Sequence, residues 1–437
     1  MLTNHNNNKQ YSFNIDRFYK DYLKGPSIFN KRDALDPSYI PKELPHRTKE
    51  IQKIAQLTAC ALLGDTPLSF LCFGMTGTGK TATIRYVSQK LAQQSSRINP
   101  WWIYINCNVV STPYRILAHI YNTISRREKI PPTGLPKDII FKKLLGILDS
   151  VIGNSICFLV LDEIDILIEK KGGNEILYNL IRLNENLDNC KTSLIGISNK
   201  LKFRDSLDPR ILSSLGEEHV VFPSYNASEL RDILSERAQV AFREGVLKEE
   251  VIPLCAALAA KEHGDARKAL QLLRKAGELA ERVQNKIVTS EHVEKAQKSL
   301  EDYHIMEYIK GLPLQAQMVL TSIYLISKFN PEHIIISGDI YEVHSEIRKL
   351  IPGIRQLTKR RISDYINDLN LAGIISADIK SMGHYGRTKI IKIDIGIDLI
   401  KRVLSDIEKF QKILNYKPIM LQTDKVKLKN NIFKKLI

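Results

Sequence analysis

The sequence lacks the cysteine pairs, the long apolar runs and the hydrophobic leader that mark several classes of protein. Its six cysteines are scattered over 437 residues with no C-x-x-C pair. Four or five of them have apolar neighbours, as buried free thiols do. This scatter argues against a zinc site, a disulfide scaffold and a secreted protein. No apolar run approaches the roughly 18 residues of a membrane span, and the first ten residues are too polar for a signal peptide.

Acidic residues are fewer than basic residues. The chain has 64 Lys and Arg against 48 Asp and Glu, a net charge of +16. Such an excess favours a polyanionic partner, although a basic balance can also serve solubility alone. Residues 1–300 carry 42 basic and 33 acidic side chains, residues 301–400 carry 12 of each, and residues 401–437 carry 10 and 3. We therefore expect a cytoplasmic, nucleoid-associated protein with no membrane partner.

The neutral segment is internally polarised. Residues 347–361 contain six basic side chains and no acid, whereas residues 301–346 contain seven acids and two bases. This split predicts one positive face on a small domain, or else an ordinary solvated helix surface.

Strands and helices alternate in the first half of the chain, which predicts an α/β domain with a parallel sheet. The apolar patterns predict strands at residues 68–73, 101–107, 156–161 and 192–197. They predict helices at residues 50–63, 80–93, 112–125, 139–151 and 173–187.

After Pro223 the pattern becomes helical. We expect helices at residues 227–244, 251–263, 265–283 and 290–303, and then at 313–328, 337–350 and 358–372. Two alternating strands follow, at residues 374–380 and 388–395. Three helices followed by a hairpin predict a winged helix, and the chain then ends in a basic helix and tail.

A glycine-rich turn lies between the first predicted strand and the next helix. It matches G-x-x-x-x-G-K-[ST] in full, and this context is the one that a P-loop requires. The glycines allow backbone N–H groups to converge on phosphates. Lys80 is expected to neutralise the β- and γ-phosphates, and the Thr81 hydroxyl to bind Mg²⁺. The predicted site for ATP or ADP includes Gly74, Thr76, Gly77, Thr78, Gly79, Lys80 and Thr81.

The third predicted strand ends in two acidic residues, Asp162 and Glu163. We expect Asp162 to hold Mg²⁺ together with Thr81, and Glu163 to orient and deprotonate the attacking water. Asp165, two residues further on, fits a capping or structural role.

Two more polar residues follow strand and helix boundaries. Asn199 stands at the tip of the fourth predicted strand, where it can reach a γ-phosphate or the water, although a turn-forming asparagine is the plain alternative. Arg267 opens a helix and can contact the γ-phosphate, or simply form a surface pair with an aspartate.

The order of these motifs resembles the AAA+ ATPases. Finer matches resemble archaeal initiators of DNA replication, which are relatives of the origin recognition complex and of its helicase-loading partner. These matches lie at residues 39–41, 44–47, 106–115, 132–134, 207–215 and 383–388. The resemblance covers roughly residues 28–396, and residues 1–27 and 401–437 match nothing that we can name.

The resemblance implies a fold and a set of partners. It implies an α/β AAA+ P-loop core with an all-α lid, followed by a C-terminal winged-helix domain. We expect a flexible arm (1–30), the core with an initiator-specific insertion (31–223), the lid (224–303), the winged helix (304–400) and a basic tail (401–437). The implied partners are double-stranded origin DNA, a replicative helicase of the MCM type, and paralogues or further copies of the chain on DNA.

The resemblance also assigns residues to the nucleotide. The extended segment containing Tyr39, Ile40 and Arg47 is expected to wrap the adenine, and Tyr225 and Arg237 to line the nucleotide. Arg210 matches a position suspected of completing a neighbour's site as an arginine finger, although it could equally contact DNA or be structural.

The predicted recognition helix, residues 358–372, has an apolar face of Ile362, Ile366 and Leu369. Its opposite face has the composition that reads base edges, although an ordinary exposed polar face would look the same. Arg360, Ser363 and Asn367 are the expected base readers on this face, with Arg360 suited to guanine and Asn367 to adenine. Tyr385 and Arg387 are the expected contacts on the wing. We expect the insertion to supply a second contact to DNA through Arg115 and Arg127.

These features predict a weak ATPase, used as a switch, that binds origin DNA and helps to load the replicative helicase. The alternative is an AAA+ DNA-binding regulator of a plasmid, virus or transposon that loads no helicase. A third, weaker reading is a clamp-loader-type ATPase, which the wing and the basic helix argue against.

Overall fold

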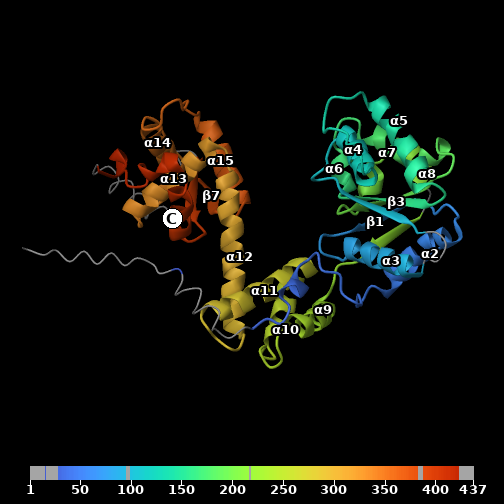
Figure 1. Cartoon of the computed structure of the whole chain (residues 1–437). Coiled ribbons are helices and arrows are strands. Elements are labelled where there is room, and N and C mark those ends of the chain that lie inside the picture. The colour runs from blue at the N-terminus through green and yellow to red at the C-terminus, as the bar shows by residue number, and fades with distance from the viewer. Residues whose placement is uncertain (1–14, 16–27, 95–98, 216–217, 382–386, 423–437) are drawn as a thin grey trace, which may run out of the picture. The chain divides into compact units, whose positions relative to one another are not determined.

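The computed structural model describes residues 15, 28–94, 99–215, 218–381 and 387–422 (Figure 1). The chain forms two compact units, Met1–Ala296 and Gln297–Ile437. The boundary between them falls within helix α12 (Ser290–Gly311).

The first unit is built on a five-stranded parallel sheet. Its strands lie in the order β2-β3-β4-β1-β5, and every pairing is parallel. Strands β1, β3 and β4 are buried along nearly their whole length, which is why they read as unbroken apolar runs. The strands are β1 (Phe70–Gly74), β2 (Trp101–Asn106), β3 (Ile156–Asp162), β4 (Lys191–Ser198) and β5 (His219–Phe222).

Helices cover both faces of this sheet (Figure 1). Alternate strand residues point to opposite faces, so Leu71 and Leu159 pack with α4 to α7, whereas Phe70 and Phe158 pack with α2 and α3. The helices of the core are α2 (Thr48–Thr58), α3 (Lys80–Gln94), α4 (Pro113–Ile124), α5 (Lys137–Ile147), α6 (Ile164–Ile168), α7 (Gly173–Ile181) and α8 (Pro209–Leu215).

Three helices, α9 (Ala227–Ala241), α10 (Val251–Lys261) and α11 (Ala266–Arg282), follow the sheet and pack against one another. The N-terminal segment docks on these helices. Ile28 is 1% exposed and its N–H donates to Glu281 Oε1, while the Phe29 ring lies 4.7 Å from that of Phe242. Residues 28–30, at the end of the predicted arm, thus pack on the lid, and most of that arm lies outside the described residues.

The second unit is a winged helix. It contains α13 (Leu314–Phe329), α14 (Ser337–Arg348) and α15 (Lys359–Leu371), with a small antiparallel sheet in the order β6-β8-β7. Its strands are β6 (Ile335–Ile336), β7 (Ile375–Ser381) and β8 (Arg387–Ile393). The three apolar residues of α15 are buried as the sequence predicts, and they join the core of this unit.

Part of the predicted basic tail belongs to the same core. Helix α16 (Ile397–Ser405) packs against α13, helix α17 (Glu408–Gln411) packs against α16, and a 3₁₀ turn follows at Ile419–Gln422. The apolar residues that carry this packing are Ile400, Val403, Leu404, Phe410, Ile413, Leu414 and Met420. The rest of the predicted tail lies outside the described residues.

Several elements differ from their predictions. The short elements α6, α8, β5 and β6 were not expected, because two to seven residues give only a weak local signal. The helix predicted at 173–187 ends at Ile181. Helix α12 continues beyond residue 303 to Gly311, since neither proline nor glycine interrupts the sequence before that point.

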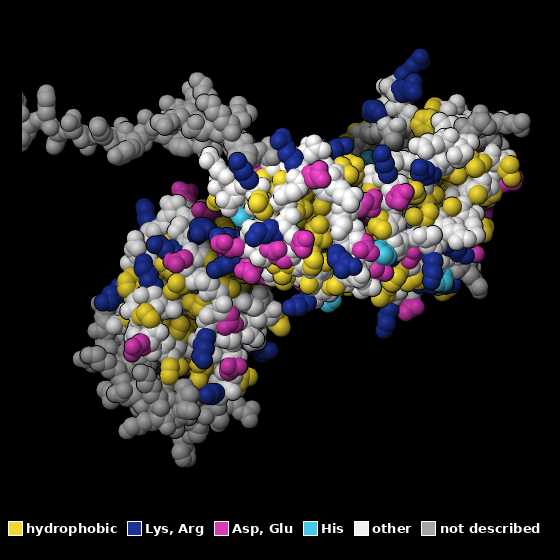
Figure 2. All heavy atoms as spheres, turned by 90° about the horizontal axis from the view of Figure 1, so that it is seen from below, with side chains coloured by type: hydrophobic (Ala, Val, Ile, Leu, Met, Phe, Trp, Pro, Cys, Tyr) yellow, Lys and Arg dark blue, Asp and Glu magenta, His cyan; other side chains and the backbone are white. Residues whose placement is uncertain are grey.

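The surface carries charges of both signs. On the face in Figure 2, basic and acidic side chains are interspersed among the described residues, so the positive excess is not gathered there. Among the residues that the structure describes, no helix is both long and apolar enough to cross a membrane.

Candidate nucleotide site and nucleic-acid interface

A cleft of about 450 Å³ lies in the first unit, between the P-loop, the lid helices and the extended segment that precedes α2. Nine of the residues predicted for the nucleotide line it, although they come from six separate places in the chain. These are Tyr39, Ile40, Gly77, Gly79, Thr81, Asp162, Tyr225, Arg237 and Arg267. Arg85 and Glu236, which the sequence analysis passed over, also line the cleft.

The P-loop connects β1 to α3, and two of its glycines have positive φ angles, 69° at Gly77 and 91° at Gly79. A Cβ atom on Gly77 would lie 1.7 Å from Asp265 Oδ1, so the lid leaves no room for a side chain there. Lys80 is buried, and its ammonium donates to the carbonyls of Gly74 and Met75 at 2.7 Å each. Burial lowers the pKa of Lys80 to about 8.

The acidic end of β3 faces the start of α3. The Thr81 hydroxyl donates to Asp162 Oδ2 at 2.7 Å, and the Glu163 N–H donates to Asp162 Oδ1 at 3.0 Å. Glu163 has a left-handed backbone, with φ at 55°. Burial raises the pKa of Glu163, and the neighbouring carboxylates of Asp162 and Asp165 raise it further. A raised pKa suits a residue that accepts a proton near neutral pH.

Asn199 directly follows β4, which lies between β3 and β1 in the sheet. In this register Ile197 pairs with Asp162 and Ser198 pairs with Phe73, so the strand tip lies between the acidic pair and the P-loop. Asn199 is half-buried and is not among the described residues that line the cleft.

The N-terminus of α11 touches the P-loop. Asp265 caps this helix by accepting the N–H groups of Arg267 and Lys268, and the Ala266 N–H donates to the Gly77 carbonyl at 3.2 Å. The cap therefore presents Arg267, in the first helical turn, to the cleft. Arg267 is close enough to Lys80 for its charge to add to the lowering of that residue's pKa, after burial.

Two buried arginines organise the extended segment. The Arg237 guanidinium, on α9, donates to the carbonyls of Ala34 and Tyr39 at 3.0 Å each and lies 4.9 Å from the centre of the Tyr39 ring. Arg237 therefore fixes the segment that carries Tyr39 and Ile40 against the lid, and all three residues line the cleft.

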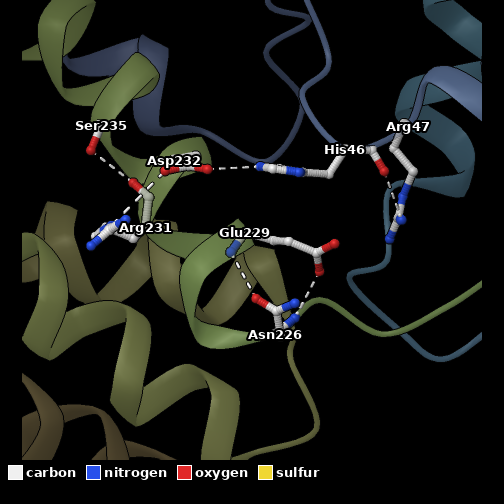
Figure 3. Close-up of polar contacts among 7 residues, drawn as sticks. All are labelled: His46, Arg47, Asn226, Glu229, Arg231, Asp232 and Ser235. Carbon is white, nitrogen blue, oxygen red and sulfur yellow. Dashed lines mark hydrogen bonds and ion pairs between the residues drawn. The ribbon is translucent and has the colours of Figure 1, made fainter.

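Arg47 is the second buried arginine, with 2% of its side chain exposed. Its guanidinium donates to the carbonyls of Thr78 and Pro223, and lies 3.8 Å from the centre of the Tyr225 ring. Among the described residues Arg47 is not part of the cleft lining, so it supports the P-loop from behind. The adjacent His46 bonds to Asp232 of α9 at 3.0 Å (Figure 3).

Arg210 lies away from this cleft. It is exposed at the start of α8, where it bonds to Asp208 at 3.0 Å and lies 5.7 Å from the centre of the Tyr178 ring. It lines a separate hollow of about 330 Å³. In a single chain Arg210 therefore does not contribute to the P-loop cleft.

The predicted DNA contacts lie in both units. Arg360 and Asn367 are exposed on α15, and Ser363 is half-buried there. Arg115, at the start of α4, and Arg127, in the loop before α5, are exposed in the first unit. Arg115 also lines an open groove of about 720 Å³ together with residues 132–136. Tyr385 lies outside the described residues, and Arg387 begins β8.

Fold and site together define an AAA+ P-loop ATPase with a helical lid and a winged-helix unit. Family models agree: "AAA domain" matches residues 64–204, "Cdc6 AAA+ ATPase-type lid domain" residues 231–298, and "CDC6, C terminal winged helix domain" residues 307–403. The chain belongs to the family of ORC1-type DNA replication proteins, because it is similar to curated members over almost its whole length.

Two such relatives are ORC1-type DNA replication proteins of Pyrococcus furiosus and Thermococcus onnurineus. The first is 47% identical over 91% of this chain and 94% of its own length, and the second 46% identical over 92% and 96%. Among solved structures, the Aeropyrum pernix ORC1 protein in complex with DNA is 40% identical. It matches 89% of this chain and 99% of its own with a TM-score of 0.74.

Proposed function

We propose that this protein is an ATP-dependent initiator that binds double-stranded origin DNA and helps to recruit or load the replicative helicase. Hydrolysis in this proposal is slow, and it switches the lid between two states rather than driving a motor. The observation that carries the proposal is the shared cleft. The P-loop, Asp162 and the lid residue Arg267 line one cavity, in a chain that also has a winged helix.

The cleft suits ATP or ADP. Backbone N–H groups of the P-loop and the buried ammonium of Lys80 would meet the phosphates. Apolar side chains suited to an adenine ring line the same cleft, namely Ile40, Pro41, Leu44, Ile233 and Leu270. Tyr39 and Arg237 would then flank the base, with Arg47 holding the loop rather than touching the nucleotide.

Thr81 and Asp162 are the residues that would hold Mg²⁺, because a hydroxyl and a carboxylate are the hard oxygen ligands that this ion prefers. Bound there, Mg²⁺ supplies positive charge to the phosphate oxygens at which negative charge develops. Glu163 would take the proton of the attacking water, Asn199 would orient that water, and Arg267 would contact the γ-phosphate. Such a contact distinguishes ATP from ADP, which is what a switch requires.

DNA binding would use two elements. Arg360, Ser363 and Asn367 of α15 would face base edges, with Tyr385 and Arg387 on the wing. Arg115 and Arg127 of the insertion would contact phosphates, so affinity would fall steeply with salt. The solved relative from Aeropyrum pernix is described as a complex with DNA, which supports this part of the proposal.

Further partners follow from the same reasoning. The exposed guanidinium of Arg210 could complete the cleft of a neighbouring copy or paralogue on DNA. The helicase that the initiator is proposed to recruit or load is of the MCM type. The initiator itself is proposed to act in the nucleoid.

Nuclease footprinting on the chain's own genome, with ATP and with ADP, tests the proposal. Protection at a replication origin, followed by retention of the purified replicative helicase on that DNA, is the expected result. Protection confined to plasmid, viral or transposon sequences would instead favour a regulator that loads no helicase. Arg360→Ala should weaken the specific site by roughly 5- to 100-fold and Arg127→Ala should weaken all sequences about equally.

A further inference from the structure

Lys389 of β8 reaches across to α15 and contacts two of the proposed base readers. Its Nζ atom lies 2.6 Å from Asn367 Oδ1 and 2.7 Å from Ser363 Oγ, and it also approaches the Ser363 carbonyl at 3.4 Å. A lysine ammonium has three donors and no acceptor, so the Asn367 atom that it contacts must be the carboxamide oxygen. The orientation of this amide is therefore fixed by chemistry.

The contact changes what Asn367 can offer to a base. A free asparagine reads adenine with both amide atoms, because its oxygen accepts from N6–H and its nitrogen donates to N7. Here one lone pair of the oxygen accepts from Lys389, and the ammonium beside it disfavours the approach of a second donor such as adenine N6–H. The exposed side chain presents the two N–H groups of Nδ2. In the part of the chain that the structure describes, no hydrogen bond engages Nδ2. Ser363 likewise accepts from Lys389, which leaves its hydroxyl hydrogen to donate.

Lys389 directs its three donors to α15, and the Asn367 amide and the Ser363 hydroxyl are left as donors; we call these three residues the Lys389 cluster (Lys389, Asn367 and Ser363). In the major groove, guanine presents two acceptors, N7 and O6, whereas adenine presents one acceptor and one donor. We propose that the Lys389 cluster selects guanine, and that Lys389 is a specificity-determining residue. This inference rests on the proposed function, since it concerns the base that the winged helix reads, and it reverses the adenine preference expected from Asn367 alone.

The rest of the helix face is consistent with this choice. Arg360 lies three residues before Ser363 and seven before Asn367, so the three share one face of α15. Arginine is also a donor without an acceptor. Asp364, whose carboxylate could accept from an adenine or cytosine amino group, lies 3.6 Å from Arg361. The neighbourhood is therefore rich in donors, as readout of guanine requires.

Selection of binding sites from randomised DNA, with the full chain, tests the inference. The variants are Lys389→Met, which keeps the length of the side chain, and Lys392→Met as the matched control. Lys392 is exposed on the same strand, so both variants lose one positive charge. Asn367→Ala identifies the base position at which α15 reads sequence.

At that position the unaltered chain should prefer guanine over adenine by roughly 5- to 100-fold. Replacing this guanine by 7-deazaguanine, which lacks the N7 acceptor, should remove most of the preference. Lys389→Met should free the Asn367 oxygen and shift the position towards adenine, whereas Lys392→Met should leave the ranking of bases unchanged.

The melting temperature of Lys389→Met would reveal a folding defect, and a second variant keeps the test decisive in that case. Asn367→Asp keeps an oxygen for Lys389 but removes the Nδ2 donors, so it should lose the guanine preference while remaining folded. An adenine preference in the unaltered chain, or an equal loss of affinity for all sequences in Lys389→Met, would overturn the inference. Failure of the unaltered chain to select any sequence would instead overturn the proposed function.

Discussion

Arg47 donates its Nε–H to the carbonyl of Thr78 at 2.8 Å, from a position behind the P-loop. The same guanidinium donates to the carbonyl of Pro223, which directly follows β5 and leads to the lid. It also stacks on Tyr225, which lines the cleft. One buried side chain thus joins the P-loop to the segment that leads from β5 into the lid.

Arg47→Ala should destabilise the first unit by about 2–5 kcal/mol, because two buried carbonyls lose their donor and the guanidinium leaves a void. Urea denaturation followed by tryptophan fluorescence measures this directly, since both tryptophans, Trp101 and Trp102, lie on β2. The exposed Lys49→Ala is the control and should change stability by less than about 0.5 kcal/mol. Equal stability of the two variants would show that Arg47 does not support the fold.

Nucleotide affinity should fall as pH rises from 7 to 9. The pKa of Lys80 is lowered to about 8 by burial, so the free protein loses this charge in that range, whereas bound phosphates would stabilise the ammonium. At pH 9 only about a tenth of the free protein carries the charge, so the dissociation constant for ATP should rise roughly tenfold. Calorimetric titrations in buffers of different ionisation enthalpy should show proton uptake on binding.

Lys80→Ala is the matching variant, and it should abolish tight binding because no other side chain supplies the cation. Normal retention of ATP on a filter by this variant would contradict the role assigned to the P-loop.

Glu163→Gln should bind ATP normally but stop its hydrolysis, because it removes the base and keeps both the shape and Asp162. In the unaltered chain the hydrolysis rate should rise with pH through the pKa of Glu163. That pKa is raised by burial and by the neighbouring carboxylates, so the rise should occur above the usual range for glutamate. Single-turnover assays measure both effects. The exposed Glu169→Gln serves as the control, and parental hydrolysis by Glu163→Gln would show that another residue activates the water.

The sequence predicted what local patterns encode. The P-loop, the acidic end of β3 and the capped start of α11 are continuous motifs, and the strands between them are unbroken apolar runs. The ORC1-type family and the winged helix were therefore confirmed. The assigned roles of the individual site residues stay predictions.

What the sequence did not reveal depends on contacts between distant residues. Asp265 fills the space beside Gly77, Arg47 bonds to Thr78, and Lys389 turns the Asn367 amide, and none of these pairs has a local signature. Sequence spacing cannot show which atom of an amide is occupied. The adenine preference expected of Asn367 was drawn from its residue type, and only the neighbouring strand changes that interpretation.

Arg267→Ala should leave ADP affinity nearly intact and reduce the difference in lid position between the ATP and ADP states. The capped start of α11 presents this side chain to the cleft, where it is proposed to contact only the γ-phosphate, and only differential contacts shift such an equilibrium. A distance label pair across the core and the lid measures the shift. Arg282→Ala, at the other end of α11, is the control. Equal loss of ADP and ATP affinity in Arg267→Ala would mark the residue as structural.

His344 should make the winged-helix unit sensitive to acid. Its side chain is fully buried in α14, and its Nε2 donates to Gln315 Oε1 at 3.1 Å. Burial, followed by the nearby charge of Arg348, lowers its pKa to about 4. Because the folded pKa lies below the ordinary value, the contribution to stability is complete above about pH 6.5 and is lost as pH falls towards 4.

The loss should amount to about 2–3 kcal/mol between pH 7 and pH 4. Urea unfolding followed by far-ultraviolet circular dichroism, at several pH values, measures it in the full chain. His344→Gln should remove that part of the pH dependence, whereas the exposed His304→Gln should retain it. At each pH, the free energy of unfolding of a variant is subtracted from that of the unaltered chain. The difference removes the contribution of the other groups that titrate in this range. The same pH dependence in both variants would show that His344 carries no proton-linked stability.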